Sequence, residues 1–202
     1  MRKIKLTRLI LLAALTAVLF LAGCSSSSAA NDAEGVTSLD KDMSNTLIVY
    51  YSYSGTTKRA AEHLQELTGG TLYELTLAEP YSGDSYAVSD RVFEERGKGE
   101  MPELSGELPD ISQYDLILVG TPVWNSSAAN PIFSYLQQTD FGGKDTALFW
   151  TYITNQGSVK KDFAKNVNNG NVKDGIALQS ANGMTNEELD EKLTSWLGSL
   201  AE

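Results

Sequence analysis

A hydroxyl-rich loop, Ser52-Tyr53-Ser54-Gly55-Thr56-Thr57, has the composition of an anion-binding site and lies between a predicted strand and a predicted helix. Hydroxyls and backbone amides at a helix N-terminus bind anions, and the helix dipole favours them. The loop has neither the lysine of a nucleotide P-loop nor a G-x-G-x-x-G sequence, so it favours a single terminal phosphate monoester. The alternative is an ordinary helix start, which needs only one capping hydroxyl.

Alternating strand and helix patterns after residue 45 predict where this loop lies. Continuous apolar stretches indicate buried strands, and apolar residues at helical spacing indicate helices. The expected strands are 46–51, 71–76, 115–120, 146–152 and 172–178. Helices are expected from about 57 to 68, over 86–97, from a cap at Asn130, over 159–167, and after a capping box formed by Thr185 and Glu188.

This order of elements predicts an α/β fold with a doubly wound, five-stranded parallel sheet, because parallel neighbours require helical crossovers. In such sheets ligands bind beyond the carboxyl ends of the strands, at a point where the strand order reverses. The hydroxyl-rich loop follows the first strand, and two further loops follow the third and fourth strands. We therefore expect these three loops to meet at one edge of the sheet.

The hydroxyl-rich loop resembles the FMN phosphate loop of the flavodoxin family, whose pattern is Ser/Thr-x-Ser/Thr-Gly-x-Thr. Ser52, Ser54, Gly55 and Thr57 match it, and Thr56 stands where asparagine is common. The likeness extends over residues 46–200. It implies a flavodoxin-like domain over residues 46–202, the strand order 2-1-3-4-5, and non-covalently bound FMN. All six residues of the loop, Ser52, Tyr53, Ser54, Gly55, Thr56 and Thr57, are then candidate cofactor ligands.

The loop after the third strand is similar to the Tyr-Pro-x-Trp-Trp-Gly segment of a flavodoxin-like subfamily. Trp124 stands at the first tryptophan position, and Asn125 replaces the second. The resemblance implies that Pro122, Val123, Trp124 and Asn125 contact the cofactor, with Trp124 against the flavin. Aromatic stacking of this kind contributes about 0.5–1.5 kcal/mol beyond the burial of area. The alternative is that Trp124 only packs in the core.

The loop after the fourth strand stands where relatives usually carry two glycines whose amides reach the pyrimidine edge of the flavin. This chain keeps Gly157 but has Asn155 and Gln156 before it. The candidate contacts here are Thr151, Tyr152, Thr154, Asn155, Gln156 and Gly157. A routine strand-to-helix turn is the alternative. The chemistry that the resemblance implies belongs to the flavin, so we predict no catalytic acid, base or nucleophile and no metal site.

The first 23 residues have the pattern of an export signal. Basic residues precede an apolar stretch, Leu9–Ala22, which is shorter than the roughly 20 residues of a membrane-spanning helix. Leu21-Ala22-Gly23-Cys24 resembles the lipobox of bacterial lipoproteins, in which the cysteine is acylated. We therefore expect cleavage after residue 23, lipidation of Cys24, a flexible Ser-rich tether over 24–45, and an extracytoplasmic, lipid-anchored protein at the cell membrane. The alternatives are a signal peptide with an incidental cysteine and an uncleaved anchor.

The net charge of −10 argues against nucleic acid as a main partner, because phosphate binding needs clustered Lys and Arg. The leading hypothesis is electron transfer at the outer face of the cytoplasmic membrane, with redox partner proteins or small-molecule electron acceptors. One alternative is an NAD(P)H-dependent FMN oxidoreductase acting on quinones or nitro compounds. Another is a cofactor-free, membrane-tethered binding module. His63, the only histidine, is expected on the solvated surface.

Overall fold

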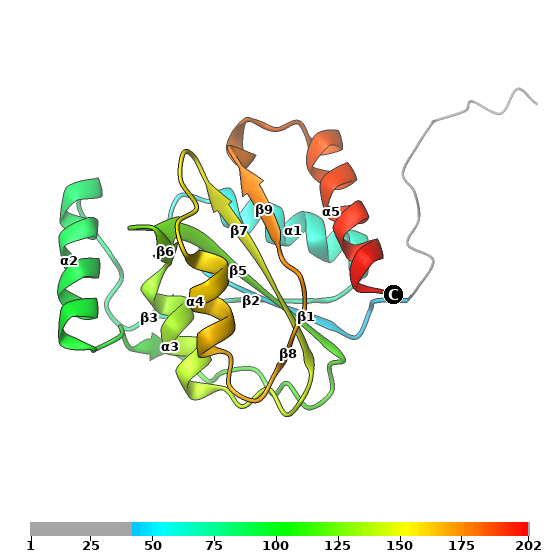
Figure 1. Ribbon diagram of the computed structural model, residues 1–202, viewed down its shortest axis with the longest axis horizontal. Helices are drawn as coiled ribbons and strands as arrows, with labels where there is room; N and C mark the ends of the chain where they lie inside the picture. The colour runs from blue at the N-terminus through cyan, green and yellow to red at the C-terminus, as the bar shows by residue number, and fades with distance from the viewer. Residues whose placement is uncertain (1–41, 202) are drawn as a thin grey trace, which may run out of the picture. The chain divides into compact units, whose positions relative to one another are not determined.

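The computed structural model describes residues 42–201 (Figure 1). The predicted signal peptide, Cys24 and most of the predicted tether lie outside these residues. In chain order the elements are β1 (Thr46–Tyr50), α1 (Thr56–Thr68), β2 (Thr71–Glu74), β3 (Thr76–Leu77), α2 (Ser85–Lys98), β4 (Leu104–Ser105), β5 (Leu116–Trp124), β6 (Ser127–Ala128), α3 (Asn130–Gln138), β7 (Asp145–Tyr152), α4 (Val159–Asn166), β8 (Asn171–Val172), β9 (Ile176–Gln179), the 3-10 helix η1 (Ala181–Gly183) and α5 (Asn186–Leu200).

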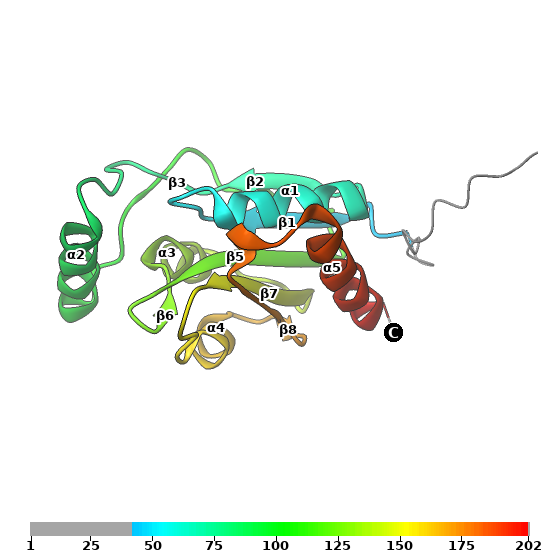
Figure 2. The ribbon, with the colours of Figure 1, turned by 90° about the horizontal axis from the view of Figure 1, so that it is seen from above.

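The central sheet has the strand order β2-β1-β5-β7, and β8 and β9 both pair with β7. These pairs are all parallel. Figure 2 shows α1 and α5 on one face of the sheet and α3 and α4 on the other. Because β8 and β9 together occupy the fifth position, the predicted doubly wound sheet with order 2-1-3-4-5 is confirmed. All five residues of β1 are buried, as expected for a strand that is covered on both faces.

The fifth strand differs from the prediction because it is broken into two short pieces around residues 173–175. Between the two pieces, the Asp174 carbonyl accepts a hydrogen bond from the Trp196 indole of α5 at 2.9 Å. At Gly175 an added Cβ would lie 2.3 Å from the Leu148 carbonyl oxygen, so the backbone passes too close to β7 for any larger residue. The predicted single strand is therefore interrupted where the backbone bonds to α5 and passes close to β7.

Two antiparallel strand pairs also lie outside the prediction. The second strand ends at Glu74, and Thr76 and Leu77 pair with β4 in a separate antiparallel ladder. Strand β5 continues to Trp124, four residues beyond its predicted end, and pairs with β6 through a two-residue turn. This β5–β6 hairpin carries the predicted tryptophan loop, so that loop is held by strand pairing.

His63 belongs to α1, and its side chain faces α5, so the expectation that it is a solvated surface residue is wrong. It is 9% exposed, and its Nδ1 lies 2.6 Å from Asp190 Oδ1 on α5. Its neighbours Ala60 and Leu64 face the same core cluster, so His63 borders the packed stripe of α1. The capping box at the start of α5 is present as predicted, whereas Asn130 is the first residue of α3 and its side chain does not cap the helix.

The amino ends of β1, β5 and β7 meet the end of α5 at one edge of the sheet. A small cavity there is lined by residues that include Met43, Asp115, Asp145 and Leu200. Met43 is buried, so the ordered packing begins before β1. The loops predicted to carry the site leave the opposite, carboxyl ends of the same strands. Within residues 42–201, no helix has both the length and the apolar character needed to cross a bilayer.

Candidate functional site

The three predicted loops meet around a cavity of about 330 Å³ at the carboxyl ends of β1, β5 and β7. Predicted site residues that line it are Ser54, Thr56, Pro122, Val123, Trp124, Thr151, Tyr152, Thr154 and Asn155. Three further lining residues are absent from the prediction: Ile153, Ala181 and Asn182. The last two belong to η1, which follows β9 and so lies beside β7 at the same edge of the sheet.

The loop after β1 presents unsatisfied donors at the start of α1. Gly55 precedes the helix with φ of 87°, the helix has no side-chain cap, and its first turn contains no acidic residue. The first amides of a helix have no intrahelical acceptors. Ser52 Oγ is buried and has no hydrogen-bond partner, and Ser54 Oγ lies 3.3 Å from Thr56 Oγ1. Ser52 does not line the cavity, but an unpartnered buried hydroxyl in the loop that leads into an uncapped helix start fits a phosphate group.

The remaining residues of this loop connect it to its surroundings instead of lining the cavity. Thr57 Oγ1 lies 2.8 Å from Thr151 Oγ1, and both residues are buried. The Tyr53 hydroxyl donates to the carbonyl of Gly83 at 3.3 Å. The first loop is therefore tied to the third loop on one side and to the segment before α2 on the other.

Trp124 packs against the core, and it also lines the cavity. Its ring makes edge-to-face contacts with Tyr51, Tyr53 and Tyr81, at centroid distances of 5.5, 5.8 and 5.0 Å. Burial raises the pKa of Tyr51 to about 12, so this tyrosine is neutral at physiological pH. Such contacts between rings restrict the orientation of Trp124.

Asn125 and Gln156 do not line the cavity, and their side chains bond to other parts of the protein. Asn125 Oδ1 accepts a hydrogen bond from Ser89 Oγ on α2 at 3.2 Å. Gln156 Oε1 accepts from Trp150 Nε1 at 3.1 Å. Gly157, with φ of 57°, packs so closely on the second loop that an added Cβ would lie 2.1 Å from the Ser126 carbonyl oxygen. These residues fix the second and third loops relative to each other and to α2.

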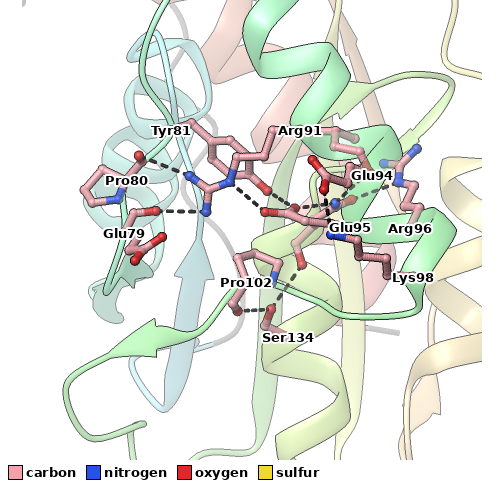
Figure 3. A network of polar contacts seen from close by, with 12 residues as sticks. Glu79, Pro80, Tyr81, Arg91, Glu94, Glu95, Arg96, Lys98, Pro102 and Ser134 are labelled. Carbon is pink, nitrogen blue, oxygen red and sulfur yellow. Dashed lines mark hydrogen bonds and ion pairs between the residues drawn. The ribbon is translucent and has the colours of Figure 1, made fainter.

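Two arginines that the sequence analysis did not single out hold loops around the cavity. Arg96 donates to the Trp124 carbonyl at 3.2 Å, and Arg59 donates to the Ala181 carbonyl at 2.7 Å. Figure 3 shows Arg96 in a polar network on α2. The sequence does indicate that Arg96 lies on the buried face of its helix, because it follows the buried Val88 and Val92 at spacings of four residues. It therefore occupies the buried stripe of a helix whose charges otherwise suggest a solvated surface.

The lining of the cavity is chemically neutral, because none of its side chains is charged. Within the described residues no group of three or more His, Cys, Asp or Glu side chains could hold a metal ion. The cavity thus combines hydroxyls, backbone amides, one tryptophan and one tyrosine. This set suits a flat aromatic ligand that carries its negative charge on a terminal phosphate.

Comparison with known proteins gives the family. The flavodoxin family model matches residues 45–199. A flavoprotein from Lactobacillus acidophilus NCFM, solved in complex with FMN, is 30% identical with a TM-score of 0.61, and the match covers 73% of this chain and 97% of that one. A candidate flavoprotein from Bacteroides eggerthii DSM 20697 is 27% identical with a TM-score of 0.65, over 78% of this chain and 98% of its own. Comparison with curated proteins gives no match. The chain belongs to the flavodoxin family and has the fold of an FMN-binding flavoprotein.

Proposed function

We propose that this protein is an electron carrier: FMN is its cofactor, and it exchanges electrons with redox partners at the outer face of the cytoplasmic membrane. The observation that supports FMN binding is Ser52 Oγ, a buried hydroxyl without a partner in the loop before the uncapped start of α1. Leaving such a group unpaired costs about 1–3 kcal/mol, so a phosphate oxygen that accepts its hydrogen bond offsets a standing cost.

Different residues around the cavity would contact different parts of FMN. The loop at Ser52–Thr57 would hold the phosphate, and Trp124 and Tyr152 are the aromatic residues available to the flavin ring. Thr154 and Asn155 offer polar groups for the ring edge. FMN supplies the redox chemistry when bound, and the chain supplies binding, orientation and exclusion of water.

Hydroxyls, amides and one indole are the only polar groups that the lining of the cavity offers, and it includes no carboxylate, amine or imidazole. This lining favours electron transfer over catalysis that needs an acid or a base. The lining side chains are uncharged, and the only histidine lies between α1 and α5, bonded to Asp190. Electron transfer needs no such group. The acidic composition favours partners with basic surfaces, since opposite charges steer association.

Attachment to the membrane through Cys24 is part of the proposal and rests on the lipobox-like sequence 21–24. Incorporation of labelled palmitate into the full-length chain, compared with a Cys24→Ser variant, tests it. Label in the wild type alone supports the anchor. Label in neither protein, with the wild type exported, would contradict it.

The first test of the cofactor is a visible spectrum of the chain from residue 25 onward, mixed with FMN and then desalted. We expect a retained flavin band with quenched fluorescence. A colourless protein that never quenches FMN would contradict the proposal and favour a cofactor-free binding module. Rapid bleaching of the bound flavin by NADPH or NADH alone would instead indicate an oxidoreductase.

A further inference from the structure

We propose that Arg96 is a positioning residue for the flavin site, because its guanidinium fixes the hairpin that carries Trp124. This inference rests on the proposed function, since Trp124 can act on a flavin only where one binds. Arg96 belongs to α2, outside the three loops that line the cavity. It would therefore act through the backbone of Trp124 and without touching the cofactor.

The guanidinium of Arg96 makes four hydrogen bonds around this hairpin. Nη2 donates to the carbonyl oxygens of Trp124 at 3.2 Å and Ala128 at 2.8 Å, which flank the turn. Nη1 donates to the carbonyl of Asn125 at 3.3 Å, and Nε donates to Asn130 Oδ1 at 2.8 Å. One side chain thus holds both strands of the β5–β6 hairpin and the first residue of α3.

The turn of this hairpin needs such support because its two central residues are strained. Asn125 and Ser126 have φ of 46° and 61°, in the left-handed region, as a two-residue type I′ turn requires. Asparagine tolerates this region and glycine is usual at the second position, whereas serine there costs about 1 kcal/mol. Local preference alone therefore holds the turn weakly, and contacts from outside it must supply the rest.

The opposite side of the turn is held by the start of α4. The backbone N–H of Ser158 donates to the Ser126 carbonyl at 2.8 Å, and the Ser127 hydroxyl donates to Asp162. The hairpin is therefore fixed between α4 on one side and Arg96 of α2 on the other. Loss of Arg96 would free one side and leave the carbonyl of Trp124 without this donor.

A second chain of contacts links the same network to the Trp124 ring, and Figure 3 shows its members Tyr81, Arg91 and Glu95. The Asn130 amide donates to Glu95 Oε2 at 2.7 Å. Glu95 also accepts from the Tyr81 hydroxyl and, at 2.8 Å, from Arg91 Nε. The Tyr81 ring contacts Trp124 edge to face at 5.0 Å. The backbone and the ring of Trp124 are thus held by one network, which orients the ring toward the cavity.

The arrangement assigns the effect to the shape of the guanidinium and not to its charge. A lysine would keep the charge but could not reach four acceptors in the fixed fork of an arginine. Arg96→Lys and Arg96→Gln should therefore behave alike. If the positive charge were what mattered, Arg96→Lys would behave as the wild type.

The test is made on the FMN-free protein labelled with 5-fluorotryptophan, whose three tryptophans give separate ¹⁹F resonances assigned by single Trp→Phe variants. We expect the Trp124 resonance to shift or broaden in both Arg96 variants, while those of Trp150 and Trp196 stay in place. Arg59→Gln is the matched control, because Arg59 makes three hydrogen bonds to residues between η1 and the start of α5, away from the β5–β6 hairpin. It should leave Trp124 unchanged.

A second-site variant separates positioning from general destabilisation. Ser126→Gly removes the strain of the turn, so in an Arg96→Gln background it should restore much of the Trp124 signal. All three resonances moving together in both Arg96 variants would show a role in folding and would overturn the inference. An unchanged Trp124 resonance in both would overturn it as well, as would wild-type behaviour of Arg96→Lys.

FMN titration then connects the hairpin to the cofactor. We expect the Kd for FMN to rise about five-fold in both Arg96 variants, in the range that lost aromatic contact accounts for. Wild-type protein that binds no FMN would contradict the proposed function but leave the ¹⁹F result standing. Equal Kd values for the wild type and both variants would overturn the inference and leave the proposed function intact.

Discussion

Thr57 Oγ1 and Thr151 Oγ1 lie 2.8 Å apart, although 94 positions separate the two residues in the chain. Both are nearly inaccessible to solvent, so each hydroxyl is the polar partner of the other. This one contact fixes the hydroxyl-rich loop against the end of β7. The fold itself therefore sets the distance between the first and third loops.

Replacing Thr151 by valine should lower the free energy of unfolding by about 1–2 kcal/mol, because the shape is kept while a buried hydroxyl of Thr57 loses its partner. Urea denaturation of the FMN-free protein measures this change. The double variant Thr57→Val/Thr151→Val should cost less than the sum of the single variants, since no unpaired hydroxyl remains. Strict additivity would contradict a direct hydrogen bond.

Ser52→Ala should weaken FMN binding about ten-fold while leaving the stability of the FMN-free protein unchanged or slightly raised. The orphaned hydroxyl costs free energy in the free protein and gains a charged partner only on binding. Isothermal titration gives the affinity, and urea denaturation gives the stability. Ser199→Ala is the control: this residue lies on α5, and its replacement should leave the affinity for FMN unchanged. Equal affinity in Ser52→Ala would remove this residue from the phosphate site.

The fold could be predicted from sequence because its determinants are local. The apolar strand 46–50 and the capping box at Thr185 each specify an element within a few residues. The three site loops follow from strand order alone, since parallel strands place their carboxyl ends together. Most lining residues of the cavity come from these loops, so they could be named before the structure.

What could not be predicted depends on contacts between distant segments. At the break in the fifth strand the Asp174 carbonyl bonds to an indole on α5, and the buried His63 bonds to Asp190 on that helix. Arg96 is local to a charged helix, but its acceptors lie 28 to 34 residues further along. Asn182 reaches the cavity only because β9 lies beside β7. No periodicity within one segment encodes such pairings.

Ser126→Gly should raise the free energy of unfolding by about 0.5–1 kcal/mol, because glycine adopts a φ of 61° without the steric cost that serine bears there. Thermal and urea denaturation of the FMN-free protein measure this gain. Ser126→Ala serves as the control, since alanine keeps the strain and should give no gain. A destabilised glycine variant would show that the turn is not strained in solution.

Stability should fall at alkaline pH because several buried tyrosines must stay protonated in the folded protein. Burial raises the pKa of Tyr51 to about 12, and burial together with a hydrogen bond to Glu95 raises that of Tyr81. In the unfolded chain tyrosine ionises near pH 10. Below about pH 10 the contribution is therefore fully present, and it is lost as the pH rises through the folded pKa.

Denaturation between about pH 9 and pH 12 measures this loss as a declining free energy of unfolding. In Tyr51→Phe the decline should be shallower than in the wild type, since one raised pKa is removed. Absorbance of tyrosinate gives an independent check, because the native protein should ionise fewer tyrosines than the unfolded chain at the same pH. Identical pH profiles for Tyr51→Phe and the wild type would contradict a raised pKa at this residue.

The chain enters β1 at Thr46 and leaves it directly into the hydroxyl-rich loop, so the first described residues and the cavity lie at opposite ends of one buried strand. A surface linker joined directly at residue 42 would therefore meet the domain at the edge of the sheet that lies away from the cavity. Immobilised in that way, the domain would keep the cavity open to the solution. One short buried strand thus separates the point of attachment from the cavity.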